Sequence, residues 1–242
     1  MEPSGIPGLD EIVGGGLVKG NCILLHGGPG SGKTTLAMQY LYNGAVMNDE
    51  PGVFITLCEN PEEIRKNMLA FGWNLKKIEA DKKLKIIDAR PVTFNEQGYI
   101  VPNNELYKNE KVPFSHISRL IVRTMREMRA KRLAIDSITV LTSQYNNPTY
   151  IRQGLLGLIQ VLSSLNCTTL LLAENRGDDK ETNLERALVQ GVILMHYARK
   201  GSAMLRAIQV LKLRGRKHSS DIYLMEISNK GIIIHPQERL EI

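Results

Sequence analysis

The chain has 242 residues, with 31 basic and 25 acidic side chains and a formal net charge of +6. This length suits a single α/β domain spanning residues 1–242, because two domains would both be rather small. No apolar stretch approaches the ~18–20 residues that span a bilayer, and no leader pattern is seen, so a soluble cytoplasmic protein is expected. Three cysteines without C-x-x-C spacing argue against a disulfide framework, and Cys22, Cys58 and Cys167 are expected to be buried reduced thiols.

Most of the chain alternates apolar runs with helical patterns. After a glycine-rich start at residues 8–20, strands are predicted at 22–27, 52–57, 84–89, 132–137 and 168–174. Helices are predicted to begin at Lys33, Pro61, Ser115 and Tyr150. Apolar runs that do not alternate with polar residues, and that helices separate, are typical of a parallel sheet covered on both faces.

The end of the chain has a different pattern. Two pairs of apolar runs, 192–198 with 206–213 and 222–228 with 232–235, are each joined through turn residues. Such pairs predict hairpins that extend the sheet with antiparallel strands.

Two segments interrupt the regular pattern. Residues 91–114 are polar, contain three prolines and are too long for an ordinary connection. We expect them to form a mobile surface insert or a contact with a partner. Residues 175–186 are predicted to form a loop of mixed charge.

The stretch GGPGSGKTT, residues 27–35, matches the pattern G-x-x-x-x-G-K-[ST] between a predicted strand and a predicted helix. Glycines let successive backbone N–H groups turn toward phosphate oxygens, and the start of the helix adds its positive dipole end. Lys33 is then placed to reach the β- and γ-phosphates, and the Thr34 hydroxyl to bind Mg²⁺. The candidate nucleotide-binding residues of this loop are Gly28, Gly30, Ser31, Gly32, Lys33, Thr34 and Thr35.

A carboxylate at the end of another predicted strand, Asp136, is the candidate partner of Thr34 at the magnesium. Ligands of an open α/β sheet bind beyond the carboxyl ends of its strands. Gly27, Glu59, Asp136 and Glu174 all follow predicted strands, so we expect them to converge on one crevice. The five histidines show no metal-ligand spacing, and magnesium is the metal expected.

Three acids lie near the end of the strand in FITLCENPEEI, residues 54–64. Asn60 is a candidate helix cap, Pro61 suits the first helical position and Glu63 falls three residues after the cap, as in a capping box. This assigns Glu62 and Glu63 to the start of a helix. Glu59 has no comparable local task, so it is the candidate base that activates the attacking water.

Five stretches together resemble the KaiC-type branch of the RecA superfamily, especially its single-domain archaeal ATPases: GIPGLDEIVGGGLVKG, GGPGSGKTT, FITLCENPEE, LAIDS and LKLRGRKH at residues 211–218. The resemblance covers nearly the whole chain. It implies a RecA-like P-loop NTPase fold, ATP and Mg²⁺ as cofactors, and a hexameric ring that binds nucleotide between neighbouring subunits.

The resemblance also implies that Lys212 and Arg214 reach the γ-phosphate bound by the adjacent subunit, with Leu213, Arg216 and His218 among the nucleotide-binding residues. Alternate residues of a strand point to the same side, so two such cations can meet one polyanion. The candidate catalytic residues are therefore Lys33, Glu59, Asp136, Lys212 and Arg214.

The sequence departs from the family pattern at Cys58. The clock protein KaiC has two adjacent glutamates at this strand end, whereas here Glu59 alone follows Cys58. We therefore expect slow hydrolysis that drives a conformational or signalling output to an unidentified protein partner. One alternative is a nucleotide sensor that binds ATP without hydrolysing it.

A second alternative is a recombinase-like ATPase that binds single-stranded DNA. Arg119, Arg123 and Arg126 recur at helical spacing and form a basic stripe on their predicted helix. The segment 175–186, at a position where RecA relatives hold DNA, carries three basic and four acidic side chains. A segment without net positive charge attracts a polyanion poorly, so nucleic acid is not the favoured partner.

Overall fold

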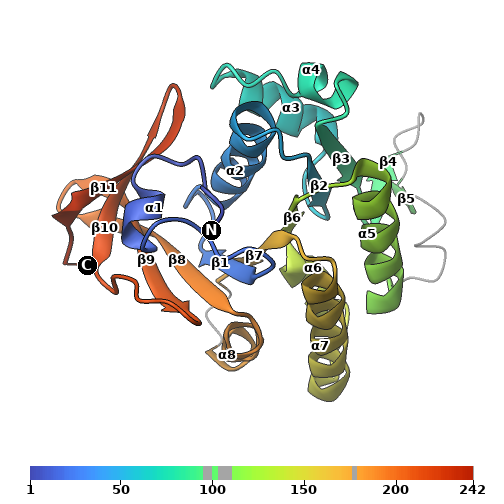
Figure 1. The fold of residues 1–242 in the computed structure, drawn as a ribbon. Helices are drawn as coiled ribbons and strands as arrows, with labels where there is room; N and C mark the ends of the chain where they lie inside the picture. The colour runs from blue at the N-terminus through green and yellow to red at the C-terminus, as the bar shows by residue number, and fades with distance from the viewer. Residues whose placement is uncertain (95–99, 103–110, 176–178, 242) are drawn as a thin grey trace.

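The computed structural model describes residues 1–94, 100–102, 111–175 and 179–241. Within them, helices cover both faces of one large sheet (Figure 1). The strands of this sheet are β1 (Cys22–Gly27), β2 (Gly52–Thr56), β3 (Leu84–Asp88), β6 (Arg132–Asp136), β7 (Thr168–Glu174), β8 (Gly191–Lys200), β9 (Ala203–Leu213), β10 (Ile222–Ser228) and β11 (Gly231–Arg239). Their order across the sheet is β11-β10-β9-β8-β1-β7-β6-β2-β3.

The centre of the sheet is parallel and one edge is antiparallel. β1 runs parallel to both neighbours, so that Gly27 lies level with Glu174 of β7 and Met195 of β8. β6, β2 and β3 continue the parallel part. β9, β10 and β11 pair antiparallel beyond β8. The predicted α/β class, with a mostly parallel sheet and antiparallel C-terminal hairpins, is confirmed.

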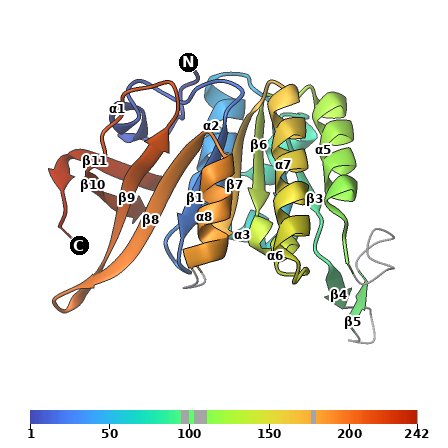
Figure 2. The ribbon, with the colours of Figure 1, turned by 90° about the horizontal axis from the view of Figure 1, so that it is seen from below.

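The two faces of the sheet carry separate sets of helices (Figure 2). One core cluster contains side chains of α1 (Leu9–Ile12), α2 (Lys33–Met47), α3 (Pro61–Leu69) and α4 (Leu75–Ala80). The other contains side chains of α5 (Phe114–Met128), α6 (Ile138–Thr142), α7 (Pro148–Ser164) and α8 (Asp179–Leu188). Every residue of β1, β2 and β6 is buried between these layers, which explains why their apolar runs do not alternate with polar residues.

Four of these helices were predicted from periodicity: α2, α3, α5 and α7. The sequence did not indicate α1, α4 and α6, which have only four to six residues each. A helical period is hard to recognise over so few positions. Among the described residues, none of the helices has both the length and the apolar character needed to cross a bilayer.

The segment 91–114 contains a small antiparallel sheet of β4 (Val92–Phe94) and β5 (Ile100–Pro102). Residues 95–99 and 103–110 make up most of the predicted mobile insert, and they lie outside the described part of the chain. The end of the segment is anchored, because Val112 and Phe114 are buried in the core cluster of α5 and α7.

The prediction of a loop over 175–186 is wrong from residue 179 onward, where α8 begins. The polar run at the start of this segment concealed the helix. Leu184 and Leu188 are four residues apart and both pack against the core cluster under α7, which supplies the apolar contact that a surface helix needs.

A fully buried arginine anchors the start of the chain to the sheet. The Arg132 guanidinium lies 2.6 Å from a carboxylate oxygen of Glu50 and 3.4 Å from one of Glu2. It also lies 4.5 Å from the ring centre of Tyr40 and donates to the Pro3 carbonyl oxygen at 2.9 Å. Because Glu2 is buried, its carboxylate depends on Arg132 for charge compensation, whereas Arg132 is compensated by both Glu2 and Glu50.

Candidate functional site

The loop between β1 and α2 has the backbone shape of a phosphate cradle. Gly30 and Gly32 have φ values of +74° and +98°, in the region that favours glycine. Lys33 is the first residue of α2, and no side chain caps the helix start. The backbone N–H groups of this first turn are therefore free of a side-chain acceptor, which is what a bound anion requires.

The Lys33 side chain folds back against the backbone of this loop. Its Nζ donates to the carbonyl oxygens of Gly27 and Gly28, at 2.9 Å each. Burial lowers the pKa of Lys33, while the charges of Glu174 and Asp136 act in the opposite direction. The ammonium group is thus held where phosphate oxygens would meet it.

Thr34 and Asp136 come together from α2 and the end of β6. The Thr34 hydroxyl donates to Asp136 Oδ2 at 2.6 Å, and Glu59 Oε1 lies 3.4 Å from the same hydroxyl. Burial raises the pKa of Asp136 to about 6, with Thr34 opposing the rise and the Glu59 charge adding to it. A hydroxyl beside crowded carboxylates offers the oxygen donors that a hard divalent cation prefers, and the cation would relieve the unfavourable burial of the charge.

One cavity of about 410 Å³ joins these groups. Its lining contains the loop, the strand ends and one apolar side chain, namely Pro29, Gly30, Gly32, Lys33, Thr34, Thr35, Cys58, Glu59, Asp136, Glu174 and Ile227. The structure therefore brings Glu59, Asp136 and Glu174 to the loop, as their places at strand ends predicted. Gly28 and Ser31 complete the loop without lining this cavity, and Ser31 is fully buried.

Two hydrogen bonds between the Glu59 backbone and the Thr56 side chain hold the chain in place just after β2. Glu59 donates its N–H to Thr56 Oγ1 at 2.9 Å, and the Thr56 hydroxyl donates to the Glu59 carbonyl oxygen at 2.8 Å. Asn60 caps α3, but its side chain accepts from the Glu62 N–H, one position earlier than a capping box with Glu63 predicts. The Glu62 carboxylate pairs with Arg65 at 2.7 Å, so it is engaged on the surface of α3.

Cys58 departs from the prediction of three buried thiols. Cys22 and Cys167 are buried, whereas Cys58 is exposed, because it lies at the mouth of the cavity, beyond the last strand residue. Desolvation at the cavity wall raises the pKa of the Cys58 thiol, and the Asp136 charge raises it further. The thiol is therefore protonated near neutral pH and cannot take the place of a carboxylate base.

Lys212 and Arg214 are not among the described residues that line this cavity. Lys212 Nζ donates to the Arg186 carbonyl oxygen at 2.7 Å, and Arg214 donates to that of Ala187 at 3.2 Å, so both cations lie beside the end of α8. Leu213, between them, is buried on the opposite side.

Arg216 and His218 lie in a separate cleft. They line it together with Glu11, Ile12 and Gly14 of the N-terminal segment, and Arg216 donates to the Gly14 carbonyl oxygen. Within the chain, the structure therefore does not bring the four predicted residues of this segment, Lys212, Arg214, Arg216 and His218, to the phosphate loop.

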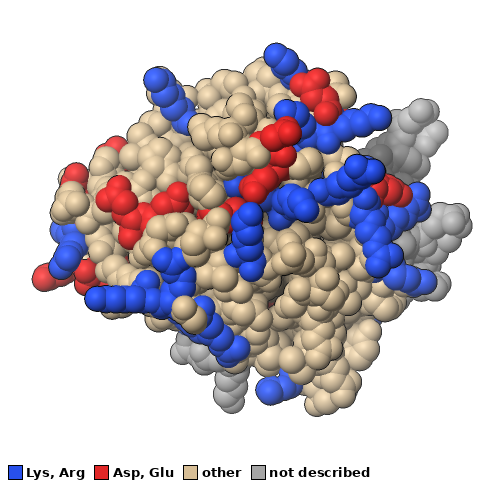
Figure 3. Space-filling model, viewed as in Figure 1, with Lys and Arg blue, Asp and Glu red and all other residues tan. Residues whose placement is uncertain are grey.

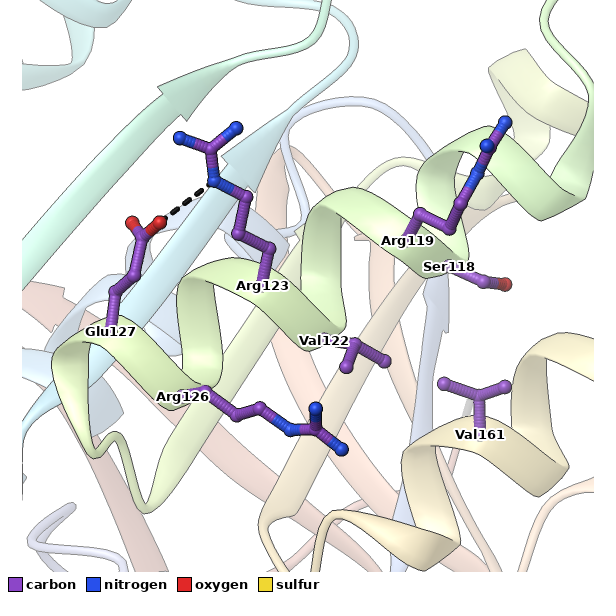
Figure 4. Close-up of a pocket in the computed structure, with 7 residues that line it drawn as sticks. All are labelled: Ser118, Arg119, Val122, Arg123, Arg126, Glu127 and Val161. Atoms are coloured by element: carbon purple, nitrogen blue, oxygen red, sulfur yellow. Dashed lines mark hydrogen bonds and ion pairs between the residues drawn. The ribbon is translucent and has the colours of Figure 1, made fainter.

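The arginines of α5 do not form a single row. Lys and Arg side chains gather over α5 in Figure 3. Arg119, Arg123 and Arg126 line a groove beside α7, but Arg123 pairs with Glu127 at 2.7 Å. Figure 4 shows Arg123 and Arg126 extending to opposite sides of the helix. This divergence weakens the single-stranded DNA interpretation, and part of the segment 175–186 on which that interpretation also depends lies outside the described residues.

Sequence reasoning missed the support of the loop tip. Arg206 of β9 donates to the Gly30 carbonyl oxygen at 2.9 Å and stacks on Tyr197 of β8 at 4.5 Å. The two residues belong to a predicted hairpin, but no local pattern shows that this hairpin lies next to β1. Only the order of strands in the sheet reveals the contact.

Comparison with known proteins places the chain in a family of ATPases. The sequence model of a family described as "ATPase: KaiC" matches residues 2–239. The chain belongs to the KaiC ATPase family. A UPF0273 protein of Thermotoga maritima is 34% identical over 242 residues, covering 97% of this chain and 96% of that protein.

Two further relatives carry the family name. The circadian clock oscillator protein KaiC of Nostoc sp. is 36% identical over 237 residues, covering 96% of this chain but only 43% of the clock protein. A crystal structure of a KaiC-like protein from Pyrococcus horikoshii matches with a TM-score of 0.82 and 35% identity, covering 97% of this chain and 98% of that one. The predicted RecA-like fold and the KaiC-type family are thus confirmed.

Proposed function

We propose that the chain binds Mg-ATP in the loop 27–35 and hydrolyses it slowly. The observation that carries the proposal is the meeting of Lys33, Thr34 and Asp136 in one cavity, with the Thr34 hydroxyl 2.6 Å from the Asp136 carboxylate. Lys33 and the loop N–H groups would hold the phosphates. Thr34 and Asp136 would hold Mg²⁺, which supplies charge neutralisation at the phosphates.

Glu59 is the proposed general base. Its carboxylate faces the cavity 3.4 Å from the Thr34 hydroxyl, and its backbone is fixed by Thr56. A base in this place can take a proton from a water that attacks the γ-phosphate. The neighbouring Cys58 cannot share this task, since its raised pKa keeps the thiol neutral. A single base at this strand end is the reason to expect slow turnover.

We further propose a hexameric ring in which Lys212 and Arg214 complete the site of the neighbouring subunit, and Arg216 and His218 contact the same nucleotide. Within their own subunit both Lys212 and Arg214 donate to backbone carbonyls at the end of α8. A phosphate group is a stronger partner for these cations than a neutral carbonyl. The output of the ring would be a conformational change that an unidentified protein partner reads.

A non-hydrolysing nucleotide sensor is the second candidate, because Cys58 occupies a wall position of the cavity where a carboxylate could serve as a base. The two candidates share ATP binding and differ only in turnover.

The test is equilibrium binding of Mg-ATP together with phosphate release and native mass, for the wild type, Lys33→Ala and Glu59→Gln. The proposal expects Mg-ATP-dependent assembly and binding in the wild type and their loss in Lys33→Ala. It expects phosphate release to fall in Glu59→Gln while binding is retained. Binding without any phosphate release above the buffer rate would support the sensor, and absence of binding would exclude both functions.

A further inference from the structure

The hairpin of β8 and β9 continues past the end of β1 (Figure 2) and reaches the tip of the phosphate loop. β1 ends at Gly27, level with Met195 of β8, whereas β8 runs on to Lys200. Tyr197 therefore lies just beyond the point where the loop leaves the sheet, and Arg206 is its direct cross-strand partner on β9. Two neighbouring side chains of one hairpin are thus placed beside the loop.

Both side chains act on Gly30 at the loop tip. Arg206 Nε donates to the Gly30 carbonyl oxygen at 2.9 Å, and the guanidinium lies 4.5 Å from the centre of the Tyr197 ring. The Tyr197 ring covers the side of Gly30 where a side chain would be, since an added Cβ would lie 3.4 Å from two ring carbons. A planar guanidinium can stack on a ring while its edge donates a hydrogen bond, which a lysine ammonium cannot do. The two side chains form a clamp on the backbone at Gly30.

The direction of the Gly30 carbonyl matters for anion binding. Gly30 lines the phosphate cavity, whereas Arg206 is not among the described residues that line it. The Gly30 carbonyl oxygen, bonded to Arg206, therefore points away from the cavity.

The peptide group between Gly30 and Ser31 can turn unless a contact holds it. Gly30 has a φ of +74°, and glycine moves between backbone conformations more freely than any other residue. Phosphates bind to backbone N–H groups, so a carbonyl oxygen turned into the cavity would repel them with its partial negative charge. A cation on the outer side of the loop opposes this turn, because it attracts the same oxygen outward.

We propose that Arg206 is a positioning residue for phosphate binding: it holds the Gly30 carbonyl away from the nucleotide, and the Tyr197 ring holds the guanidinium in place. The inference rests on the proposed function, because it assigns a task at the loop that binds ATP. Among the described residues, the polar and ring contacts of the Arg206 side chain are with Gly30 and Tyr197. Arg206 therefore contributes to the affinity for the triphosphate and not to the chemical step.

The test is equilibrium titration of Mg-ATP and of Mg-tripolyphosphate into wild-type and Arg206→Met protein. Loss of the charge-assisted hydrogen bond that orders the loop tip should weaken the binding of both ligands about five- to twentyfold. The two ligands should lose affinity by the same factor, because Gly30 belongs to the loop that holds the phosphates. Phosphate release at saturating Mg-ATP should stay within about twofold of the wild-type rate, so that KM rises while kcat is kept.

The matched control is Arg199→Met on the same hairpin. Arg199 is exposed and also donates to a carbonyl oxygen, but its acceptor is Gly201 in the hairpin turn, at 3.1 Å. Its loss should leave the affinity for both ligands unchanged. Arg206→Lys, which keeps the charge, should recover part of the affinity. Tyr197→Phe keeps the ring and should bind as the wild type does, whereas Tyr197→Leu should weaken binding in the same direction as Arg206→Met.

A spectroscopic readout reports on the loop itself and does not depend on turnover. In carbon NMR, the Gly30 carbonyl resonance should move upfield in Arg206→Met, as the loss of a hydrogen bond at this oxygen requires, and stay in place in Arg199→Met. Equal affinity of the wild type and Arg206→Met for Mg-ATP, an unmoved Gly30 resonance, or the same loss in Arg199→Met would overturn the clamp while the proposed function stands. Wild-type protein that binds neither ligand would overturn the proposed function and the clamp together.

Discussion

Replacing Asp136 by Asn should stabilise the nucleotide-free protein while damaging its magnesium-dependent binding of ATP. Asp136 is 7% exposed, and burial raises its pKa from 3.8 to about 6. Each pKa unit corresponds to about 1.4 kcal/mol, so at pH 7.5 the ionised carboxylate costs the folded state roughly 3 kcal/mol. Asn keeps the size and can accept the Thr34 hydrogen bond without the charge.

The raised pKa of Asp136 also predicts how the stability of the folded state changes with pH. A carboxyl group whose pKa is raised on folding favours the folded state when protonated, so its contribution is present below pH 3.8 and is lost as pH rises toward about 6. The stability difference between Asp136→Asn and the wild type should therefore be about 2–3 kcal/mol at pH 7.5 and shrink as the pH falls from 6 toward 4. Burial is the main cause of the raised pKa of Asp136, and the charged groups that modify it, Glu59, Lys33 and Glu174, are common to both proteins.

The assay is urea unfolding of both proteins without nucleotide at several pH values, followed by thermal shifts with Mg-ATP at pH 7.5. Mg-ATP should raise the melting temperature of the wild type more than that of Asp136→Asn. Glu241→Gln, which neutralises an exposed carboxylate near the end of the chain, is the control and should change neither quantity. An Asp136→Asn protein that is less stable at pH 7.5, or that differs from the wild type equally at all pH values, would refute the account of this site.

Two further predictions concern the packing that supports the site, and urea unfolding measures both. Gly154→Ala should destabilise the fold by about 1–3 kcal/mol, because its Cβ would lie 2.2 Å from the buried Phe114 ring; Gly157→Ala on the same helix meets nothing within 4 Å and should stabilise by about 0.5–1 kcal/mol. Equal effects of the two substitutions would contradict this packing. Arg132→Met should cost about 3–5 kcal/mol because it leaves the buried Glu2 carboxylate without its cation, and adding Glu2→Gln should recover part of the loss. A double variant no more stable than Arg132→Met would show that the pair is not coupled.

The fold could be predicted to a large extent because its strands and long helices carry strong local signals. The buried runs of β1, β2 and β6 follow directly from their apolar pattern. The helix start at Lys33 follows from the phosphate-loop motif, and the one at Pro61 from its capping residue Asn60. α8 was not predicted because its first half is polar, and the apolar contacts of Leu184 and Leu188 depend on the core against which they pack.

For the candidate site as well, some features could be predicted from the sequence and others could not. The phosphate loop and Asp136 could be predicted because their chemistry requires particular residues next to strand ends. The bond from Arg206 to Gly30 depends on which strands are neighbours across the sheet. Strand order is set by packing between segments far apart in the sequence, and no local pattern records it.

The central claim is that one subunit supplies the phosphate loop and its neighbour supplies the cations of the nucleotide site. Mixing Lys33→Ala subunits with Arg214→Ala subunits tests it most directly, with phosphate release from Mg-ATP as the readout. Each variant alone should be inactive, whereas an equal mixture that reassembles at random should recover about a quarter of wild-type activity, because a quarter of the interfaces pair an intact loop with an intact Arg214. A mixture no more active than the separate variants, or an Arg214→Ala protein with wild-type turnover, would contradict the claim.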